Sequence, residues 1–580
     1  MYCLLKKNEY FAGKYTKKSK NMEKIMQETV TIYCKNNNEY RDVPIGSSLK
    51  DIYKMVGTPL RYRPMSARVN QRVEGLDWQC WHPKDIEYVD ITSQAGFRTY
   101  LRSICYILTK AVNDIYPDAA FSLKHPVSKG YYCTFDDQRV ITHEEVDRIK
   151  EQMSMIIEAD IPFVLHTIHT ADAIQLFRKH GMNDKALLIE TAGMTYTSYY
   201  EMDGYIDYYY GCLVPSSGYI YLFGLIPYED GMLLQIPDGN NPIQLPPMTH
   251  QHKMFHAFKE HLTLQRTLGI NYVGDMNMAV SHGNAKEIIK VSEAMQEKQI
   301  AHIAEEIARR YKEGVRIILI SGPSSSGKTT FCKRLQIQLI TNFLYPIGVS
   351  LDDYYVNRED TPKDETGAYD FESLYAIDIP YFQQDLTKLI AGEEVEIPSF
   401  NFTLGKRTYR GDKLQMKHNS VLLLEGIHGL NPELTASLPP ENIFRVYVSA
   451  LTTIALDGHN WIPTTDNRLL RRIVRDYRSR GYSAKATISG WASVRRGEDK
   501  WIFPYQENAD AMFNSAMIYE LAVLRKYAEP ILSEIREMDR ESAEAYRLIR
   551  FLRYFNYIQL DELPATSLLR EFLGGGNFSY

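Results

Sequence analysis

The chain has 580 residues, 44% of them hydrophobic, and its 67 lysine and arginine residues nearly balance its 72 aspartate and glutamate residues. This length exceeds what one compact core can serve, and the balanced charge excludes a molecule-wide basic field for non-specific nucleic-acid binding. The 7 cysteines form no C-x-x-C pair, which argues against a thiolate zinc site and a disulfide framework and favours the reducing cytoplasm. No segment has the length and apolarity of a membrane span, so we expect no membrane partner.

The first two predicted regions are a leader and a small domain. Residues 1–27 carry lysines without a long apolar run, and we expect a disordered leader or an upstream extension of a chain that starts at Met22 or Met26. Residues 28–92 include the stretch VTIYCKNNNEYRDVPIGSSLKDIYKMVG, which predicts a hairpin and then a short helix that starts near Ser47 and Ser48. These elements predict a small ubiquitin-like α+β domain.

A second α+β domain is predicted over residues 93–245. The stretch YLRSICYILTKAVNDIY has apolar residues at helical spacing, and GYIYLFGLIPYEDGMLLQI is typical of strands. Residues 246–314 are predicted to be a linker and an amphipathic helix, which begins at Asn284 as its cap and ends at Gly314.

An α/β domain is predicted over residues 315–535. The apolar runs IILI, IGVSL, VLLLEG and FRVYVSA alternate with helical segments, as in a parallel sheet flanked by helices. The tail, residues 536–580, is predicted to be helical and to pack either on this domain or on another subunit, so a homo-oligomer is an open alternative.

A phosphate-binding loop follows the first of these apolar runs. The stretch SGPSSSGKTT matches G-x-x-x-x-G-K-[ST] between a predicted strand and a predicted helix. In such a loop the backbone amides wrap a phosphate, the lysine reaches the β and γ oxygens, and the threonine hydroxyl ligates Mg²⁺. We therefore predict ATP and Mg²⁺ binding here, with Lys328 also catalytic and Thr329 a metal ligand, through Gly322, Ser324, Ser325, Ser326, Gly327, Lys328, Thr329 and Thr330.

Acidic residues follow two other predicted strands, and ligands of open α/β sheets bind at the carboxyl ends of the strands. Asp352 and Asp353 follow IGVSL, and Glu425 ends VLLLE. A carboxylate near the γ-phosphate can accept a proton from an attacking hydroxyl, and one near the metal can orient Mg²⁺. We predict Asp352 as the catalytic base and Glu425 as a group on the metal side or the phosphate side, with a metal-ligand role first, although either carboxylate can also be a loop cap.

An arginine-rich helix is predicted from NRLLRRIVRDYRSRG. Leu470, Ile473, Val474 and Tyr477 share one face, which leaves Arg468, Arg472 and Arg475 to project elsewhere. Such arginines suit a lid that closes over a transferring phosphate, and a solvated basic face is the alternative.

Residues 315–530 resemble the uridine kinase family, which is related to phosphoribulokinase and bacterial pantothenate kinase. The resemblance rests on SGPSSSGKTT, SLDDYY, YDFESLYAID, GEEVEIPSFNF, LLLEGI and RLLRRIVRD. It implies a P-loop kinase with Asp352 as base toward a ribose 5′-hydroxyl and with catalytic lid arginines Arg472 and Arg475. It also implies substrate-binding roles for Tyr355, Asp370, Phe400, Arg407 and Arg471.

Two departures from this family affect the substrate. Phe400, Asn401 and Gly405 stand where the family has a tyrosine–aspartate pair and a base-reading histidine. The stretch ALTTIALDGHNWIPTTDN also lengthens the segment before the arginine-rich helix.

Residues 28–240 resemble the N-terminal part of threonyl-tRNA synthetase, with its TGS-type ubiquitin-like domain and its editing domain. The stretches HPVSKGYYCTFD, ADAIQLFRKHG and DYYYGCLVPSSGYIYLFGL carry this resemblance. The family's editing ligands fall on Arg102, Tyr106, Tyr209 and Leu213, which lack imidazole and thiolate groups, so we expect no editing chemistry.

The predicted fold class is α/β, a P-loop NTPase parallel sheet flanked by helices and preceded by two smaller α+β domains. The leading functional hypothesis is an ATP- and Mg²⁺-dependent cytoplasmic kinase for the 5′-hydroxyl of a nucleoside, uridine or cytidine first, with a silent synthetase-like module. A kinase of another small hydroxyl compound, such as a pantothenate-like acid or a sugar phosphate, is one alternative. Another is a nucleotide-gated regulatory protein whose front half binds tRNA or an amino acid.

Overall fold

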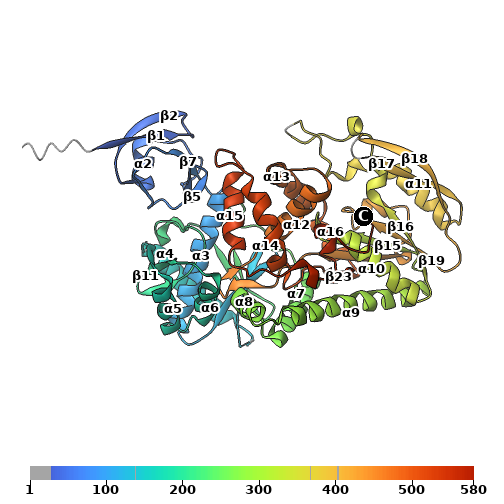
Figure 1. Cartoon of the computed structure of the whole chain (residues 1–580), viewed down its shortest axis with the longest axis horizontal. Coiled ribbons are helices and arrows are strands. Elements are labelled where there is room, and N and C mark those ends of the chain that lie inside the picture. The colour runs from blue at the N-terminus through green and yellow to red at the C-terminus, as the bar shows by residue number, and fades with distance from the viewer. Residues whose placement is uncertain (1–27, 138, 366, 402–403, 580) are drawn as a thin grey trace, which may run out of the picture.

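The computed structural model describes residues 28–137, 139–365, 367–401 and 404–579 (Figure 1). The expected leader, residues 1–27, lies outside the described residues. Within the described ranges, no helix combines the length and the hydropathy that crossing a bilayer requires.

The chain begins with a mixed five-stranded sheet in the order β2-β1-β7-β4-β5, with one helix packed on it. The predicted hairpin and helix are confirmed, and the side chain of Ser48 caps the helix by accepting the amide of Asp51. The elements are β1 Thr29–Cys34, β2 Glu39–Pro44, β3 Ser47–Ser48, α2 Leu49–Val56, β4 Ser66–Val69, β5 Arg72–Glu74, β6 Gln79–Cys80 and β7 Asp85–Val89.

A long helix, α3, runs through the next region and is buried along most of its length. It packs beside the antiparallel sheet β13-β14-β9-β8 and the smaller sheet β10-β11-β12. The elements are α3 Gln94–Ile115, β8 Phe121–Val127, β9 Gly130–Phe135, α4 His143–Glu158, β10 Val164–His169, α5 Thr170–Lys179, α6 Asn183–Ala192, β11 Tyr196–Met202, β12 Tyr205–Asp207, β13 Gly224–Tyr228 and β14 Gly231–Gln235. The expected strand character begins only at Gly224, because a 3-10 turn occupies Ser217–Tyr219.

Three helices connect this region to the next: α7 His252–Leu268, α8 Val273–Ser281 and α9 Ala285–Tyr311. The predicted amphipathic helix is α9, which runs along the lower edge of the C-terminal half (Figure 1) and packs on the helix after the phosphate loop. Asn284 occupies its N-cap position, but its side chain makes no capping hydrogen bond.

The C-terminal half is built on a parallel five-stranded sheet in the order β16-β19-β15-β20-β23. The strands are β15 Ile317–Ser321, β16 Tyr345–Ser350, β19 Ser420–Glu425, β20 Ile443–Ser449 and β23 Ala511–Asn514. The residues of β15, β19 and β20 are almost all buried, as expected for strands covered by helices on both faces, whereas the edge strand β16 leaves Tyr345 and Gly348 exposed. The predicted fold class is therefore confirmed, with a parallel sheet flanked by helices and preceded by smaller α+β regions.

Helices and two hairpins complete this half. The helices are α10 Lys328–Thr341, α11 Ile379–Ile390, α12 Thr464–Ser479, α13 Ala484–Trp501, α14 Glu520–Ser533, α15 Ser542–Leu552 and α16 Arg570–Leu573. The hairpins are β17 Val395–Asn401 with β18 Lys406–Leu414, and β21 Ala455–Asp457 with β22 Asn460–Trp461. In the tail, α15 packs on α14, and α16 packs on α12.

Candidate active site

The phosphate loop connects β15 to α10 with a tightly constrained backbone. Gly327 has φ +86° at the start of α10, a left-handed conformation that favours glycine. Gly322 faces the carbonyl oxygen of Val448, which a β-carbon there would approach to 2.0 Å. The hydroxyls of Ser325 and Ser326 are buried without a hydrogen-bond partner among the described residues. These unsatisfied donors fit a loop that holds an oxyanion such as a phosphate.

A cavity of about 470 Å³ opens at the carboxyl ends of β15, β16 and β19. Its size and position suit a small ligand in an open α/β sheet. Eleven of the predicted site residues line this cavity: Ser324, Ser325, Gly327, Lys328, Thr329, Asp352, Tyr355, Phe400, Glu425, Arg472 and Arg475.

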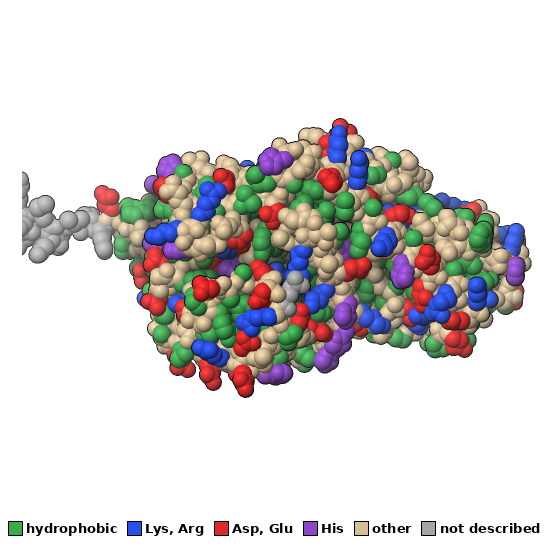
Figure 2. Space-filling model, turned by 90° about the horizontal axis from the view of Figure 1, so that it is seen from below, with side chains coloured by type: hydrophobic (Ala, Val, Ile, Leu, Met, Phe, Trp, Pro, Cys, Tyr) green, Lys and Arg blue, Asp and Glu red, His purple; other side chains and the backbone are tan. Residues whose placement is uncertain are grey.

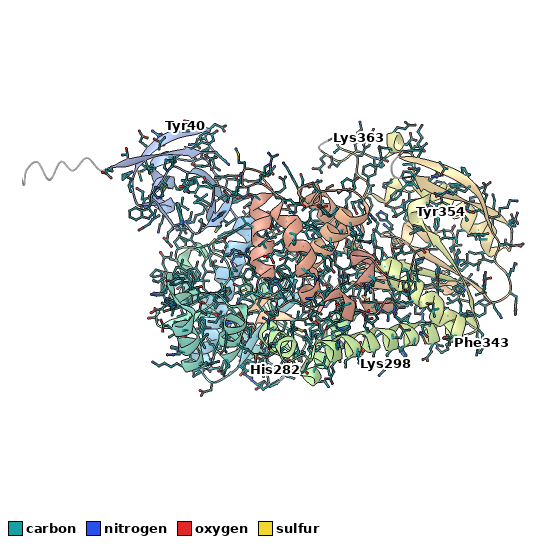
Figure 3. The ribbon with its side chains drawn as sticks, in the orientation of Figure 1. Tyr40, His282, Lys298, Phe343, Tyr354 and Lys363 are labelled. Carbon is teal, nitrogen blue, oxygen red and sulfur yellow. The ribbon has the colours of Figure 1, made fainter. Side chains whose placement is uncertain are left out.

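Asp352 lies on a 3-10 turn directly after β16. Tyr354, two positions later on the same turn, marks this place in the C-terminal half (Figure 3). Burial raises the pKa of Asp352, while the ammonium of Lys328 and a hydrogen bond from Tyr355 act in the opposite direction. A half-buried carboxylate with a raised pKa that shares a cavity with a lysine is a suitable proton acceptor for a hydroxyl.

Glu425 ends β19, and burial raises its pKa to about 7. Lys328 and a hydrogen bond with the Thr329 hydroxyl act in the opposite direction. A half-buried carboxylate beside a threonine hydroxyl has the oxygen donors that Mg²⁺ prefers, and water and phosphate oxygens could supply further ligands. The residues present therefore fit the predicted metal position.

Lys328 is the counter-charge of both carboxylates. Burial lowers its pKa, and Glu425 and Asp352 act to raise it. Its ammonium donates to the carbonyl of Pro323 at 3.3 Å, within the phosphate loop.

The arginines of α12 divide into two groups. Arg472 and Arg475 line the cavity and pair with Asp476, and Arg472 also donates to the Ser324 hydroxyl at 2.9 Å. Arg468, which the sequence grouped with them, is instead buried in an ion pair with Glu498. Tyr477, expected on the buried face, is 42% exposed.

Three residues expected to bind substrate do not line the cavity. Arg471 is fully buried and pairs with Glu520 because it lies on the packed side of α12. Arg407 bonds to Asp378 and to the carbonyls of Tyr354 and Tyr355, so it holds the segment that carries Asp352. Asp370 accepts the backbone amide of Glu372 at 3.2 Å, and Glu372 is the residue that reaches the cavity. Gly322 and Ser326 of the loop and Thr330 in the first turn of α10 do not line the cavity.

Glu372 and Arg480 also line the cavity, and the sequence did not single them out. Burial raises the pKa of Glu372 to about 7, with Arg472 acting in the opposite direction. Glu372 stands inside the stretch YDFESLYAID, two positions after Asp370, so the sequence pattern indicated the right segment, but Glu372 and not Asp370 lines the cavity.

The tail supplies a further lining residue, Glu571. Its carboxylate accepts the amide of Thr330 at 3.0 Å and the hydroxyl of Thr330 at 2.7 Å. Leu568 packs against Gly327, where a β-carbon would approach it to 2.5 Å. The tail therefore contacts the first turn of α10, 241 positions earlier in the chain.

The positions corresponding to editing ligands lie around α3. Tyr106 donates to the carbonyl of Tyr205 at 2.7 Å, and Arg102 donates to the carbonyl of Cys212. Tyr209 and Leu213 are buried in the core. Over the described parts of the chain, no three His, Cys, Asp or Glu side chains gather as a metal-binding group.

Comparison with known proteins separates the two halves. Residues 317–521 match the model of the "Phosphoribulokinase / Uridine kinase family". The threonine–tRNA ligase of Desulforamulus reducens is 26% identical over 179 residues, which cover 31% of this chain and 28% of the ligase. That of Geobacter sp. (strain M21) is 26% identical over 185 residues, which cover 32% of this chain and 29% of the ligase. The chain thus spans less than a third of the length of these relatives.

Among solved structures, a putative fructose transport system kinase from Silicibacter sp. TM1040 is similar with a TM-score of 0.27 and 18% identity, covering 37% of this chain and 98% of that one. A possible uridine kinase from Bacillus stearothermophilus has a TM-score of 0.27 and 17% identity, with the same coverage of 37% and 98%. Residues 317–521 are similar to the phosphoribulokinase and uridine kinase family, and the N-terminal half is similar to part of threonine–tRNA ligases.

Proposed function

We propose that the chain is an ATP-dependent kinase that transfers the γ-phosphate to a hydroxyl of a small molecule, with the 5′-hydroxyl of uridine or cytidine as the first candidate. The family match supports a P-loop kinase. The observation that carries the proposal is one cavity that is lined both by Lys328 of the phosphate loop and by the half-buried carboxylate of Asp352.

Each group then has a role that its surroundings suit. Asp352 accepts the proton of the attacking hydroxyl, because burial raises its pKa. Lys328, Arg472 and Arg475, which line the same cavity, neutralise charge on the transferring phosphate. Thr329 and Glu425 would hold Mg²⁺, which would supply further neutralisation of phosphate charge.

The acceptor lies against the wall of the cavity that Tyr355 and Phe400 form together. Their rings meet edge to face with centroids 5.7 Å apart, next to Asp352 in the cavity lining. Aromatic walls hold a planar base or an apolar acyl chain, so a nucleoside and another hydroxyl compound are both accommodated. We propose the nucleoside as first candidate because the family includes uridine kinases.

We propose a regulatory role for the N-terminal half. On the face shown in Figure 2, lysine and arginine are interspersed with aspartate and glutamate and do not gather into a basic patch. Binding of tRNA stays a prediction for this half.

We place the enzyme in the cytoplasm, since all six cysteines of the described residues are free thiols.

Replacement of the proposed base tests the function. In Asp352→Asn, phosphate transfer from radiolabelled ATP to the best acceptor in a panel of nucleosides, vitamins and sugars should fall by about 10²–10⁴-fold, because the base is lost. ATP affinity, measured by calorimetry, should stay close to the parent value.

Asp353→Asn is the matched control. Asp353 accepts the amide of Phe400 at 3.1 Å outside the cavity lining, and asparagine can do the same. Equal transfer rates in Asp352→Asn and the parent would refute the role of the base. A nucleotide-binding chain without transfer to any acceptor would favour the regulatory alternative.

A further inference from the structure

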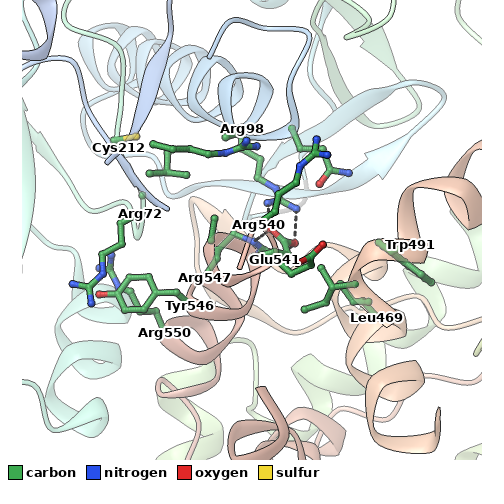
Figure 4. A pocket seen from close by; sticks show the side chains of 18 of the residues that line it. Arg72, Arg98, Cys212, Leu469, Trp491, Arg540, Glu541, Tyr546, Arg547 and Arg550 are labelled. Atoms are coloured by element: carbon green, nitrogen blue, oxygen red, sulfur yellow. Dashed lines mark hydrogen bonds and ion pairs between the residues drawn. The ribbon is translucent and has the colours of Figure 1, made fainter. Parts of the chain in front are cut away.

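A second cavity, of about 460 Å³, lies between the two halves of the chain (Figure 4). Strand β5 and helix α3 of the N-terminal half form one wall, and α15 forms the other, with Leu469 of α12 and Trp491 of α13. Among the described residues it shares no lining residue with the candidate active site. We call it the interdomain cavity.

The lining of the interdomain cavity is strongly basic. Seven arginines line it, against three glutamates. Arg98 and Arg547 are already paired, since both bind the carboxylate of Glu544. Arg540 and Arg550 are exposed and form no ion pair with any residue that the structure describes. Two cationic groups are therefore available at the cavity for a ligand.

At one end of the interdomain cavity, Arg550 shares an aromatic partner with another arginine. Arg72 and Arg550 lie on Tyr546, at 4.7 and 5.8 Å from its ring centroid (Figure 4). The ion-pair partner of Arg72 is Glu537, whose side chain is 86% exposed, so this pair contributes little to stability and leaves Arg72 open to a stronger anionic partner. Two guanidinium groups on one ring concentrate positive charge at this end of the cavity, which a bound anion would offset.

Two deeper arginines keep unused donors. Arg68 has a buried Nε without an acceptor among the described residues. Arg102 donates from Nε and Nη2 to the carbonyl of Cys212, and its Nη1 has no acceptor among the residues that the structure describes. A buried donor without an acceptor is costly, and a ligand oxygen would satisfy it.

We propose that the interdomain cavity is a binding site for a small phosphorylated metabolite with at least two anionic groups. Guanidinium forks match the geometry of phosphate oxygens, and a cavity of this volume suits a small molecule rather than a nucleic-acid strand. The ligand would bridge α3 and α15. It would also touch α12, which presents Arg472 and Arg475 to the active site.

Calorimetric titration of the full chain with inorganic pyrophosphate tests this site. The Lys328→Ala variant is used as background, because it weakens binding at the phosphate loop. Pyrophosphate should still bind to this variant. Adding Arg540→Gln and Arg550→Gln should weaken that binding by about tenfold or more, since each loses charged hydrogen bonds to the anion.

Arg41→Gln is the matched control, because Arg41 is an exposed arginine on β2 and lies outside the cavity. This substitution should leave the affinity for pyrophosphate unchanged. If Lys328→Ala does not fold, the parent should show two binding events, of which the double arginine variant loses one. Unchanged affinity in the double variant, or no pyrophosphate binding at all in the Lys328→Ala background, would overturn the proposal. So would Arg540- and Arg550-dependent binding of a single-stranded RNA oligonucleotide without binding of pyrophosphate.

Discussion

Glu571 occupies a position that a nucleotide phosphate would need. Its carboxylate accepts both the amide and the hydroxyl of Thr330 at the start of α10, where the helix dipole and the free amides favour an anion. A phosphate oxygen cannot use the same donors while the carboxylate holds them. Nucleotide binding therefore has to displace this contact.

Glu571→Gln should raise ATP affinity, because the neutral amide is a weaker acceptor than the carboxylate and no longer repels phosphate. We expect a decrease in the dissociation constant by about threefold to tenfold, as one charged hydrogen bond to Thr330 is weakened. Calorimetry with ATP and magnesium measures it. Asp561→Asn, an exposed change in the same tail, should have no effect. Weaker ATP binding in Glu571→Gln would show that this carboxylate helps to hold the nucleotide.

At the scale of the elements, the contact between β8 and α7 buries a histidine. His125 stacks on Phe258 with ring centroids 3.3 Å apart, and neither ring nitrogen has a partner among the described residues. Burial lowers the pKa of His125 to about 3. It also lowers the pKa of His261, which lies on α7 with Phe258, to about 4. Both side chains are therefore neutral in the folded protein at neutral pH.

This contact should make the fold sensitive to acid. An unfolded histidine binds a proton below its pKa of 6.5, whereas folded His125 stays neutral down to about 3. Stability is therefore fully present above 6.5 and is lost as the pH falls between these values, by up to about 1.4 kcal/mol per pH unit for one group.

Urea denaturation at about pH 5 and about pH 7 measures the loss. His125→Leu should reduce the difference between the two, whereas His302→Gln, an exposed change on α9, should not. An unchanged pH dependence in His125→Leu would contradict the assignment.

At the scale of the whole molecule, the hairpin β21–β22 joins the two halves. Lys185 on α6 pairs with Asp457 of this hairpin at 2.8 Å and with Asp207 at 2.9 Å, and all three side chains are buried. His459 pairs with Asp207 at 2.8 Å. Burial alone would lower the pKa of Lys185, but Asp207 and Asp457 outweigh it and raise the pKa.

Lys185→Met should therefore destabilise the whole chain. The change leaves two buried carboxylates without their cation, which costs about 3–5 kcal/mol. Urea denaturation measures it, and the exposed pair of Lys413 and Glu394 provides the control, since Lys413→Met should cost about 0–1 kcal/mol. An equal loss of stability in both variants would mean that the buried pair does not hold the halves together.

Local patterns were sufficient for much of the active site. Lys328, Asp352 and Glu425 each follow an apolar strand, and parallel strands bring their carboxyl ends to one edge of the sheet, so their meeting could be predicted. Arg471 and Asp370 could not be placed correctly, because helix rotation and loop path decide which neighbour faces the cavity. The stretch from Ala450 to Asn467 could be recognised as an insertion, but its length did not predict that it contacts Lys185 and Asp207 of the N-terminal half.

The sequence by itself determined the parallel α/β sheet, the phosphate loop and the carboxylates beside it, because strand periodicity and loop chemistry act over short stretches of chain. Only the tertiary structure decided that Glu571 lies on the phosphate loop, that Lys185 binds Asp457, and that arginines of both halves line one cavity. These contacts join segments far apart in the chain, and their energies depend on burial and proximity, which no local pattern records.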